Sequence, residues 1–259
     1  MNCRRVQETN IGGIAIYNDF AFYYDRFMGD VKYERWADYI IKIFSRKRFK
    51  PALIADLGCG TGSFCIEMAG RGYDMIGIDI SSEMLSCAAQ KAMKAGTDIL
   101  FLNQDMTSFE LYGTVDAMTC LMDSINYVTY KNDLKRLFKL VNNYLNPGGL
   151  FIFDINSPYK FENIFSTNVF CETDADAAYI WRNNFDKSGG LCRFDLSFFI
   201  KEERLYRRFD EVHFERVYSQ RELMEMLSAA GLKTASVYGE FTFSKPSEKC
   251  ERIFFVCKK

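Results

Sequence analysis

Three glycines alternate directly after a short apolar run, at Gly58, Gly60 and Gly62. The run ends in Asp56, and an amphipathic segment begins at Ser63. Glycines at such a turn let a ligand lie against the backbone, because no Cβ stands in the way. The spacing G-x-G-x-G differs from the G-x-G-x-x-G of dinucleotide-binding folds, so it disfavours a dehydrogenase and argues for a ligand other than a pyrophosphate. A tight turn that binds no ligand is the alternative.

A second carboxylate, Asp79, stands near the end of the next apolar run, residues 75–80. It follows the glycine turn by about 20 residues, where nucleotide-binding folds place the acidic residue that binds ribose hydroxyls. The two oxygens of Asp79 are therefore expected to accept hydrogen bonds from the 2′ and 3′ hydroxyls of an adenosine.

His213 is the only histidine of the chain, which makes it the candidate for a general base at neutral pH. Asp210, Glu211 and Glu215 lie close to it in sequence. A structural or merely exposed histidine is the alternative. Four nearby arginines are candidates to bind an anionic substrate, or else form the solvated face of a sheet. They are Arg182, Arg193, Arg207 and Arg208.

Apolar runs and helical periods alternate along the first part of the chain. Strands are expected at 52–56, 75–80, 99–104, 115–121 and 150–155, and helices at 33–46, 63–70, 82–95 and 131–145. Such alternation predicts a parallel sheet that is covered on both faces.

The pattern changes after Pro158. Residues 159–178 are expected to be irregular, and the aromatic–charged alternation in 179–218 predicts antiparallel strands. A helix at 219–230 and strands near 233–241 and 251–257 follow. We therefore expect one α/β domain, residues 1–157 and 217–259, interrupted by an antiparallel lid at 158–216. A lid after the fifth strand would stand over the carboxyl ends of the strands, where open α/β sheets bind ligands.

Five segments resemble, in order, the motifs of class I S-adenosylmethionine-dependent methyltransferases. They are DLGCGTG (56–62), GIDIS (77–81), NQDM (103–106), TCLMDSINYV (119–128) and NPGGLFIFDIN (146–156). The N-terminal YNDFAFYYDRFM and the insertion are similar to the bacterial branch that acts on small molecules. The resemblance implies a Rossmann-like fold, with a mostly parallel seven-stranded sheet whose last strand is antiparallel.

The resemblance also implies the cofactor, S-adenosylmethionine, its product, S-adenosylhomocysteine, and the residues that bind them. The methionine end of the cofactor is expected to be bound by Asp56 and the turn residues Gly58, Cys59, Gly60 and Gly62. The ribose is expected to be bound by Asp79. The adenine is expected to contact Ile80, Met84, Asp105 and Met106. Met122, Asp123 and Asn126 would lie at the methyl-transfer end. Tyr17, Tyr24 and Trp36 are similar to aromatic residues that cover the cofactor, with plain core packing as the alternative.

The leading hypothesis is methyl transfer to a small molecule, with an amine favoured over a hydroxyl. Trp181 is a candidate to hold such an amine by cation–π attraction. The alternatives are a catalytically silent cofactor-binding module and an RNA or protein methyltransferase. The formal net charge of −1 lacks the basic excess that a general nucleic-acid-binding protein would show. The acceptor and the oligomeric state are not indicated by the sequence.

Nine cysteines without a C-x-x-C pair suggest reduced thiols and a cytoplasmic protein. No apolar run has the length of a membrane span. No zinc-ligand spacing occurs. Asp123, Asp154 and Asn156 could imitate a magnesium set, but hydrogen bonding of these side chains is the favoured interpretation and no metal is expected.

Overall fold

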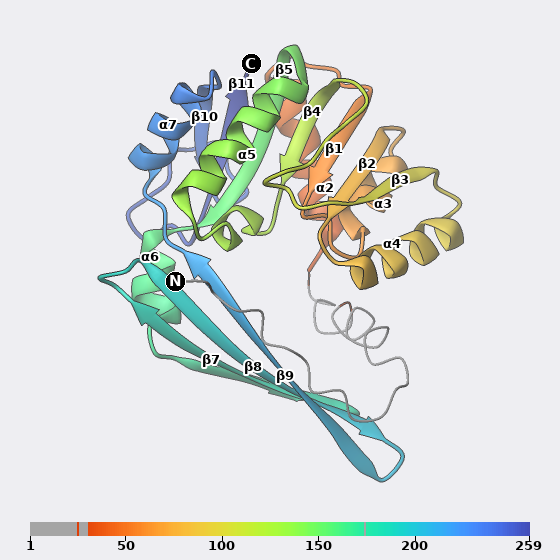
Figure 1. The fold of residues 1–259 in the computed structure, drawn as a ribbon, viewed down its shortest axis with the longest axis vertical. Helices are drawn as coiled ribbons and strands as arrows, with labels where there is room; N and C mark the ends of the chain where they lie inside the picture. Colours follow the sequence, from red (N-terminus) through yellow and green to blue (C-terminus); the bar gives the residue numbers. More distant parts are fainter. Residues whose placement is uncertain (1–24, 26–30, 174) are drawn as a thin grey trace.

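The computed structural model describes residues 25, 31–173 and 175–259, which form two β-sheets (Figure 1). Tyr17 and Tyr24 lie outside the described residues. The larger sheet has seven strands in the order β10-β11-β5-β4-β1-β2-β3. These are β1 (Leu53–Leu57), β2 (Asp74–Asp79), β3 (Ile99–Asn103), β4 (Val115–Cys120), β5 (Leu145–Asn156), β10 (Lys233–Gly239) and β11 (Arg252–Lys258).

The strand directions confirm the predicted fold class. The pairs β1–β2, β2–β3, β1–β4 and β4–β5 are parallel, whereas the last strand, β11, is antiparallel to both of its neighbours. In this arrangement the carboxyl ends of β1, β2, β4 and β5 meet at one edge of the sheet. Most of the candidate site residues predicted from the sequence lie at or shortly after these strand ends.

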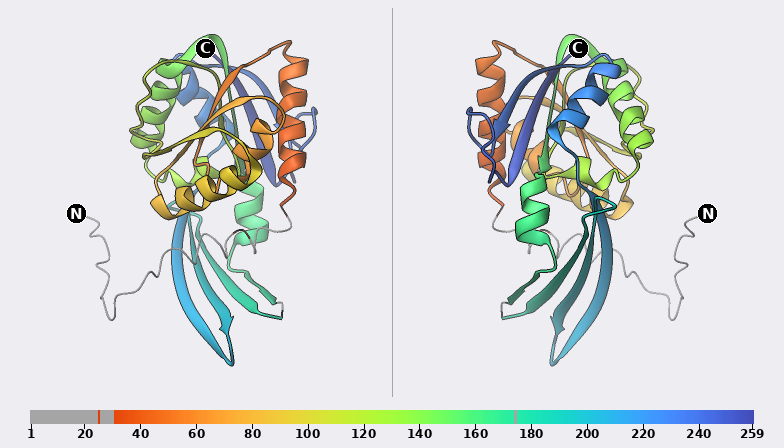
Figure 2. Two further views of the ribbon diagram at one scale, coloured as in Figure 1. Left: turned by 90° about the vertical axis from the view of Figure 1, so that its right-hand side faces the viewer. Right: turned by 90° about the vertical axis from the view of Figure 1, so that its left-hand side faces the viewer.

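Helices cover both faces of this sheet (Figure 2). The helices of the domain are α2 (Tyr33–Arg46), α3 (Ser63–Ala69), α4 (Ser82–Ala95), α5 (Lys131–Tyr144) and α7 (Gln220–Ala229). Apolar residues of α5 and α7 pack into one core cluster, and those of α2 and α3 pack into the other. Strand β5 serves both clusters, since Phe151 and Phe153 face the first while Ile152 faces the second. Successive side chains of a strand point to opposite faces, so a central strand must be apolar throughout.

The smaller sheet is antiparallel, with the order β6-β7-β8-β9, and it extends away from the carboxyl-end edge of the larger sheet (Figure 1). Its strands are β6 (Val169–Thr173), β7 (Ala177–Asp186), β8 (Leu191–Glu202) and β9 (Leu205–Arg216). The chain enters this part after β5 ends at Asn156 and returns to the larger sheet through α7. That this sheet is a substrate lid stays a prediction.

The prediction that residues 159–178 are irregular is wrong. This stretch contains the end of a short helix, α6 (Pro158–Lys160), a π-helical turn, η2 (Phe161–Phe165), and the edge strand β6. Tertiary contacts order this stretch, because Phe161 and Phe165 are buried against Phe185 and Phe194 of the small sheet. No helix of the described residues is long and apolar enough to cross a membrane.

Candidate functional site

The turn between β1 and α3 is tied to the end of β2. The amides of Gly58 and Cys59 both donate to the Ile78 carbonyl, at 2.8 and 3.0 Å. The Gly60 amide donates to Asp79 Oδ2 at 2.8 Å. All three glycines of the turn have positive φ, at +71°, +54° and +73° for Gly58, Gly60 and Gly62. These bonds hold the turn in a left-handed path that other residues adopt at a cost.

The three glycines have different neighbours. A Cβ on Gly58 would lie 2.9 Å from Ser124 Oγ, and one on Gly62 would lie 2.8 Å from the Cβ of Ala88. A Cβ on Gly60 would meet no heavy atom within 4 Å. Gly58 and Gly62 are therefore required by packing against the protein itself. Gly60 presents bare backbone to open space, which is where a ligand has room to lie.

Asp79 accepts one backbone amide on each carboxylate oxygen, from Gly60 on Oδ2 and from Ser81 on Oδ1 at 2.9 Å. Burial raises the pKa of this carboxyl, while these amide bonds oppose the shift. A carboxylate offers about four lone-pair sites, so two remain for a pair of ribose hydroxyls. Ile80, the next residue, has a 71% exposed side chain that an adenine ring could cover. Met84 lies one helical turn on, and its amide donates to the N-cap hydroxyl of Ser81.

Asp56 is buried beneath the turn rather than open to solvent. Its Oδ1 accepts from the Thr119 hydroxyl at 2.6 Å, and its Oδ2 faces the Cys65 thiol at 3.6 Å. Burial raises the pKa of Asp56 to about 7. The carboxyl thus joins β1 to β4 and α3 under the glycine turn, and its predicted contact with the methionine end stays a prediction.

Residues after β3 complete this half of the site. The Gln104 amide donates to the Asp79 carbonyl at 2.9 Å, which ties the ends of β3 and β2 together. Asp105 Oδ1 accepts from the Thr107 amide at 2.7 Å. The Met106 methyl lies 3.2 Å from where a Cβ on Gly58 would be, so Met106 borders the glycine turn. Contact of Asp105 and Met106 with adenine stays a prediction.

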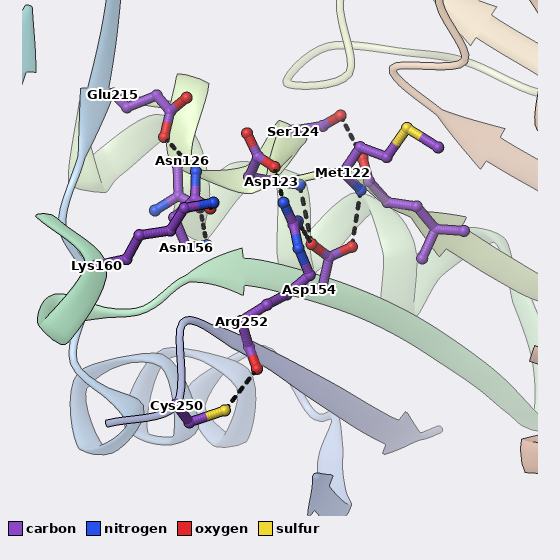
Figure 3. Close-up of polar contacts among 11 residues, drawn as sticks. Met122, Asp123, Ser124, Asn126, Asp154, Asn156, Lys160, Glu215, Cys250 and Arg252 are labelled. Atoms are coloured by element: carbon purple, nitrogen blue, oxygen red, sulfur yellow. Dashed lines mark hydrogen bonds and ion pairs between the residues drawn. The ribbon is translucent and has the colours of Figure 1, made fainter. Parts of the chain in front are cut away.

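The chain turns sharply after β4, where Met122 and Asp123 both have positive φ, at +56° and +57°. Two successive non-glycine residues in this region are uncommon and cost about 1–3 kcal/mol each, and such strain clusters at functional sites. The amides of both residues donate to the Asp154 carboxylate, at 2.8 and 3.0 Å (Figure 3). The corner is thus held by the end of β5.

Arg252, the first residue of β11, closes this corner from the far side (Figure 3). Its guanidinium donates to Asp154 and, at 2.7 Å, to Asp123. Burial raises the pKa of Asp154 to about 6, although Arg252 opposes the shift. The oxygens of Asp154 are taken up by two amides and a guanidinium. This is the hydrogen-bonded arrangement that the sequence favoured over a magnesium set.

Asn126 lies on η1 (Ser124–Tyr127) and is fully buried. Its Nδ2 donates to the Arg216 carbonyl at 2.8 Å, and its Oδ1 accepts from the Asn156 amide at 3.0 Å. It therefore connects the corner after β4 to the last residues of β5 and β9. No surface of Asn126 is open to a ligand in this conformation. A contact between Asn126 and the cofactor would require these bonds to change, and it stays a prediction.

His213 lies beside η1, the short helix that follows β4. Its Nε2 is 2.8 Å from Glu211 Oε2, and its ring meets the ring of Tyr127 edge-on, with centroids 5.9 Å apart. His213 and Glu211 share one face of β9, since they are two residues apart on a strand. The structure therefore gives His213 a carboxylate partner and places it against η1. Its catalytic role stays a prediction.

Of the aromatic candidates that the structure describes, Trp36 is buried and Trp181 is partly buried. Trp36 is 7% exposed, packs against Phe241 and Phe254, and lies under the Arg252 guanidinium at 5.3 Å. It therefore supports the corner through Arg252. Trp181 is surrounded by Phe165, Phe170 and Phe194, with centroids 5.3–5.5 Å away. The cation–π role of Trp181 stays a prediction.

Sequence reasoning missed Arg252 and Lys160. Arg252 opens a strand that is otherwise apolar up to Cys257, which is an unusual position for a charge. Its partner Asp154 is 98 positions away, so the pairing has no local signal. Lys160 lies within the stretch that was expected to be irregular.

A glycine turn after β1, a carboxylate at the end of β2 and a strained corner after β4, on a mostly parallel seven-stranded sheet, define a Rossmann-like domain. Residues 54–149 match the family model described as "Methyltransferase domain". The "Putative methyltransferase YqeM" of Bacillus subtilis is 38% identical over 247 residues, which cover 94% of this chain and 97% of that protein.

Two further comparisons extend this result. The crystal structure of an S-adenosylmethionine-dependent methyltransferase from Clostridium acetobutylicum has a TM-score of 0.86 and 34% identity, covering 94% of this chain and 99% of that one. The dTDP-3-amino-3,4,6-trideoxy-alpha-D-glucopyranose N,N-dimethyltransferase of Streptomyces venezuelae is 24% identical over 229 residues, which cover 85% of this chain and 93% of that protein.

The chain belongs to the S-adenosylmethionine-dependent methyltransferases, and the resemblance seen in its motifs is confirmed. S-adenosylmethionine is its cofactor and S-adenosylhomocysteine its product. The open backbone at Gly60 and the spare acceptor sites of Asp79 fit that cofactor.

Proposed function

We propose that the protein methylates an amine nitrogen of a small molecule. The observation that carries this proposal is the pairing of His213 with Glu211 at 2.8 Å, beside Tyr127 of η1. An amine is mostly protonated at neutral pH and must lose its proton before its nitrogen can attack. A histidine oriented by a carboxylate is suited to take that proton.

The cofactor, when bound, supplies an electrophilic methyl group on a sulfonium. The residues of the chain supply orientation. Glu211 accepts from the Nε2–H of His213, which leaves Nδ1 as the free base. Asp79 and the backbone at Gly60 hold the nucleoside, and the corner at Met122 and Asp123 bounds the methyl-transfer end. Fixing donor and acceptor in this way lowers the entropic part of the barrier.

Two further observations support a small amine acceptor. The relative from Streptomyces venezuelae is named as an N,N-dimethyltransferase of an amino sugar nucleotide. The charges of the small sheet are also paired with one another, as in Arg193–Asp195, Arg207–Glu202 and Arg208–Asp210. A nucleic-acid groove requires a basic excess that such pairs do not provide. The sheet therefore favours a small molecule over RNA.

The test is release of S-adenosylhomocysteine, measured by mass spectrometry over a panel of amines, phenols and carboxylates. We expect amines to be methylated, and His213→Gln to lower kcat by about 10²- to 10⁴-fold, the range for a positioned general base. Asp195→Asn, on the neighbouring strand, is the control and should keep the rate. Turnover of hydroxyl acceptors alone would contradict the proposal, and a panel without any turnover would favour the catalytically silent module.

A further inference from the structure

At the junction of the two sheets, Lys160 and Glu215 each contact the carboxamide of Asn156 instead of each other. Lys160 Nζ donates to Asn156 Oδ1 at 3.0 Å, and Asn156 Nδ2 donates to Glu215 Oε2 at 2.9 Å (Figure 3). Asn156 ends β5 and Glu215 lies near the end of β9. The carboxamide therefore separates the Lys160 ammonium from the Glu215 carboxyl, and burial raises the pKa of that carboxyl well above its ordinary value.

The ammonium of Lys160 is held in place but poorly paired. It lies 5.0 Å from the centre of the Phe165 ring, and Asn156 Oδ1 is its only polar contact among the described residues. An ammonium has three donors, so two have no protein partner in this part of the chain. Burial and the nearby Arg252 lower the pKa of Lys160. Removing an ammonium from water without a carboxylate partner costs free energy.

Arg252 provides the contrast within the same cluster. Its guanidinium is shared between Asp123 and Asp154, so its charge is satisfied by the protein. Lys160 is near enough to Asp123, Glu215 and Glu251 for these carboxyl groups to oppose the lowering of its pKa, yet its ammonium bonds to none of them. The Lys160 ammonium is positioned by the Asn156 carboxamide and the Phe165 ring, and two of its N–H donors remain for an anionic ligand.

The position of Lys160 relates this anion to the reaction. Asn126, which lies on η1, accepts a hydrogen bond from the Asn156 amide. The next residue of η1, Tyr127, contacts the ring of His213. The junction therefore adjoins the end of the sheet at which the proposed amine would be deprotonated. An acceptor bound there would have its nitrogen near His213 and a second group near Lys160.

We propose that the Lys160 ammonium binds an oxyanion of the methyl acceptor, so that the acceptor is an amine that also carries a carboxylate or a phosphate. This inference rests on the proposed amine methylation and narrows its substrate class. Asn156 is the positioning residue, because its carboxamide keeps Glu215 away from the ammonium.

The test uses acceptor pairs that differ only in the anion, namely glycine against glycinamide and phosphoethanolamine against ethanolamine. We expect the wild type to favour the anionic member of one pair by about 10- to 100-fold in kcat/KM, the range for one hydrogen bond to a charged group. The preferred pair identifies the anion as carboxylate or phosphate. Lys160→Met should reduce that preference to within about twofold through KM, and Lys160→Arg should keep part of it.

Lys187→Met is the matched control, because Lys187 lies in the same part of the chain but pairs with Glu162 on the surface. It should keep the preference. Calorimetric titration with S-adenosylhomocysteine must give the same Kd for Lys160→Met as for the wild type, which shows that the variant folds. A preference that survives in Lys160→Met, or a wild type without any preference, overturns the inference.

A second measurement needs no turnover, so it separates failure of this inference from failure of the proposed function. The protein saturated with S-adenosylhomocysteine is heated in phosphate, acetate or chloride at constant ionic strength. Phosphate or acetate should raise the Tm of the wild type above its value in chloride, and Lys160→Met should lose the rise. Equal Tm values in the three anions would overturn the inference, even if amines are methylated.

Discussion

At the scale of single residues, Asp79 stabilises the fold and is predicted to bind the ligand as well. Asp79 fixes the glycine turn through Gly60 and accepts from the amide of Ser81, the N-cap of α4, while keeping acceptor sites free. We predict that Asp79→Ala weakens S-adenosylhomocysteine binding by about 1.5–3 kcal/mol, as for loss of hydrogen bonds to a charged group. Calorimetric titration measures the change. Asp74→Ala, at the exposed start of the same strand, should bind as the wild type does, and an unchanged Kd for Asp79→Ala would contradict the assignment.

Asp56 gives the stability of the fold a pH dependence. Its pKa rises from the usual 3.8 to about 7, because the carboxyl is buried. Between these values the unfolded chain ionises Asp56 while the folded chain keeps it protonated, so its contribution to stability is present below pH 3.8 and is lost as the pH rises through 7.

We therefore predict that Asp56→Asn, which cannot ionise, gains stability relative to the wild type between pH 5 and pH 8, by at least about 1 kcal/mol. Urea unfolding at both pH values measures the difference. Thr119 can still donate to the asparagine oxygen, so the local packing is kept. A difference between the two proteins that does not change with pH would show that Asp56 is ionised in the folded state across this range.

At the scale of elements, the sequence predicted the segments whose periodicity is local. The expected helices at 33–46 and 82–95 are confirmed as α2 and α4, because each has an apolar face and α4 has both a serine N-cap and a glycine C-cap. The stretch at 159–178 was missed, because the burial of Phe161 and Phe165 depends on strands that come later in the chain. The Arg252–Asp154 pair was missed for the same reason.

The turn between β1 and α3 allows a prediction that separates folding from binding. Gly60→Ala should destabilise the fold by only about 1–2 kcal/mol through its positive φ, and should abolish S-adenosylhomocysteine binding because the new methyl fills the open space. Gly62→Ala should cost more stability, because its methyl also meets Ala88 and Phe101.

Gly72→Ala is the control, since Gly72 also has a positive φ and open space but lies in the loop between α3 and β2. It should lose as much stability as Gly60→Ala and keep its affinity. Urea unfolding and calorimetric titration report the two quantities separately. If Gly60→Ala bound S-adenosylhomocysteine as Gly72→Ala does, the open space at Gly60 would not be the cofactor site.

At the scale of the whole molecule, a polar junction connects the two sheets in the part of the chain that the structure describes. Asn126 contributes to it twice, by donating to the Arg216 carbonyl of β9 and by accepting from the Asn156 amide of β5. Glu215 and Lys160 add to it through the Asn156 carboxamide. Any motion of the small sheet over the carboxyl ends of the strands must strain or break these bonds.

Asn126→Ala tests this connection. The substitution removes the partner of the buried Asn156 amide, which costs about 1–3 kcal/mol, and also removes a hydrogen bond to the partly buried Arg216 carbonyl. We predict faster hydrogen exchange at the ends of β5 and β9, with an unchanged Kd for S-adenosylhomocysteine, because Asn126 has no exposed surface. Asn163→Ala, which removes only a local bond to the Tyr159 carbonyl on the surface, should leave exchange at both strand ends as it is. The opposite result, weaker binding with unchanged exchange, would place Asn126 at the methyl-transfer end, where the motif resemblance put it, and would mean that its two bonds rearrange when the cofactor binds.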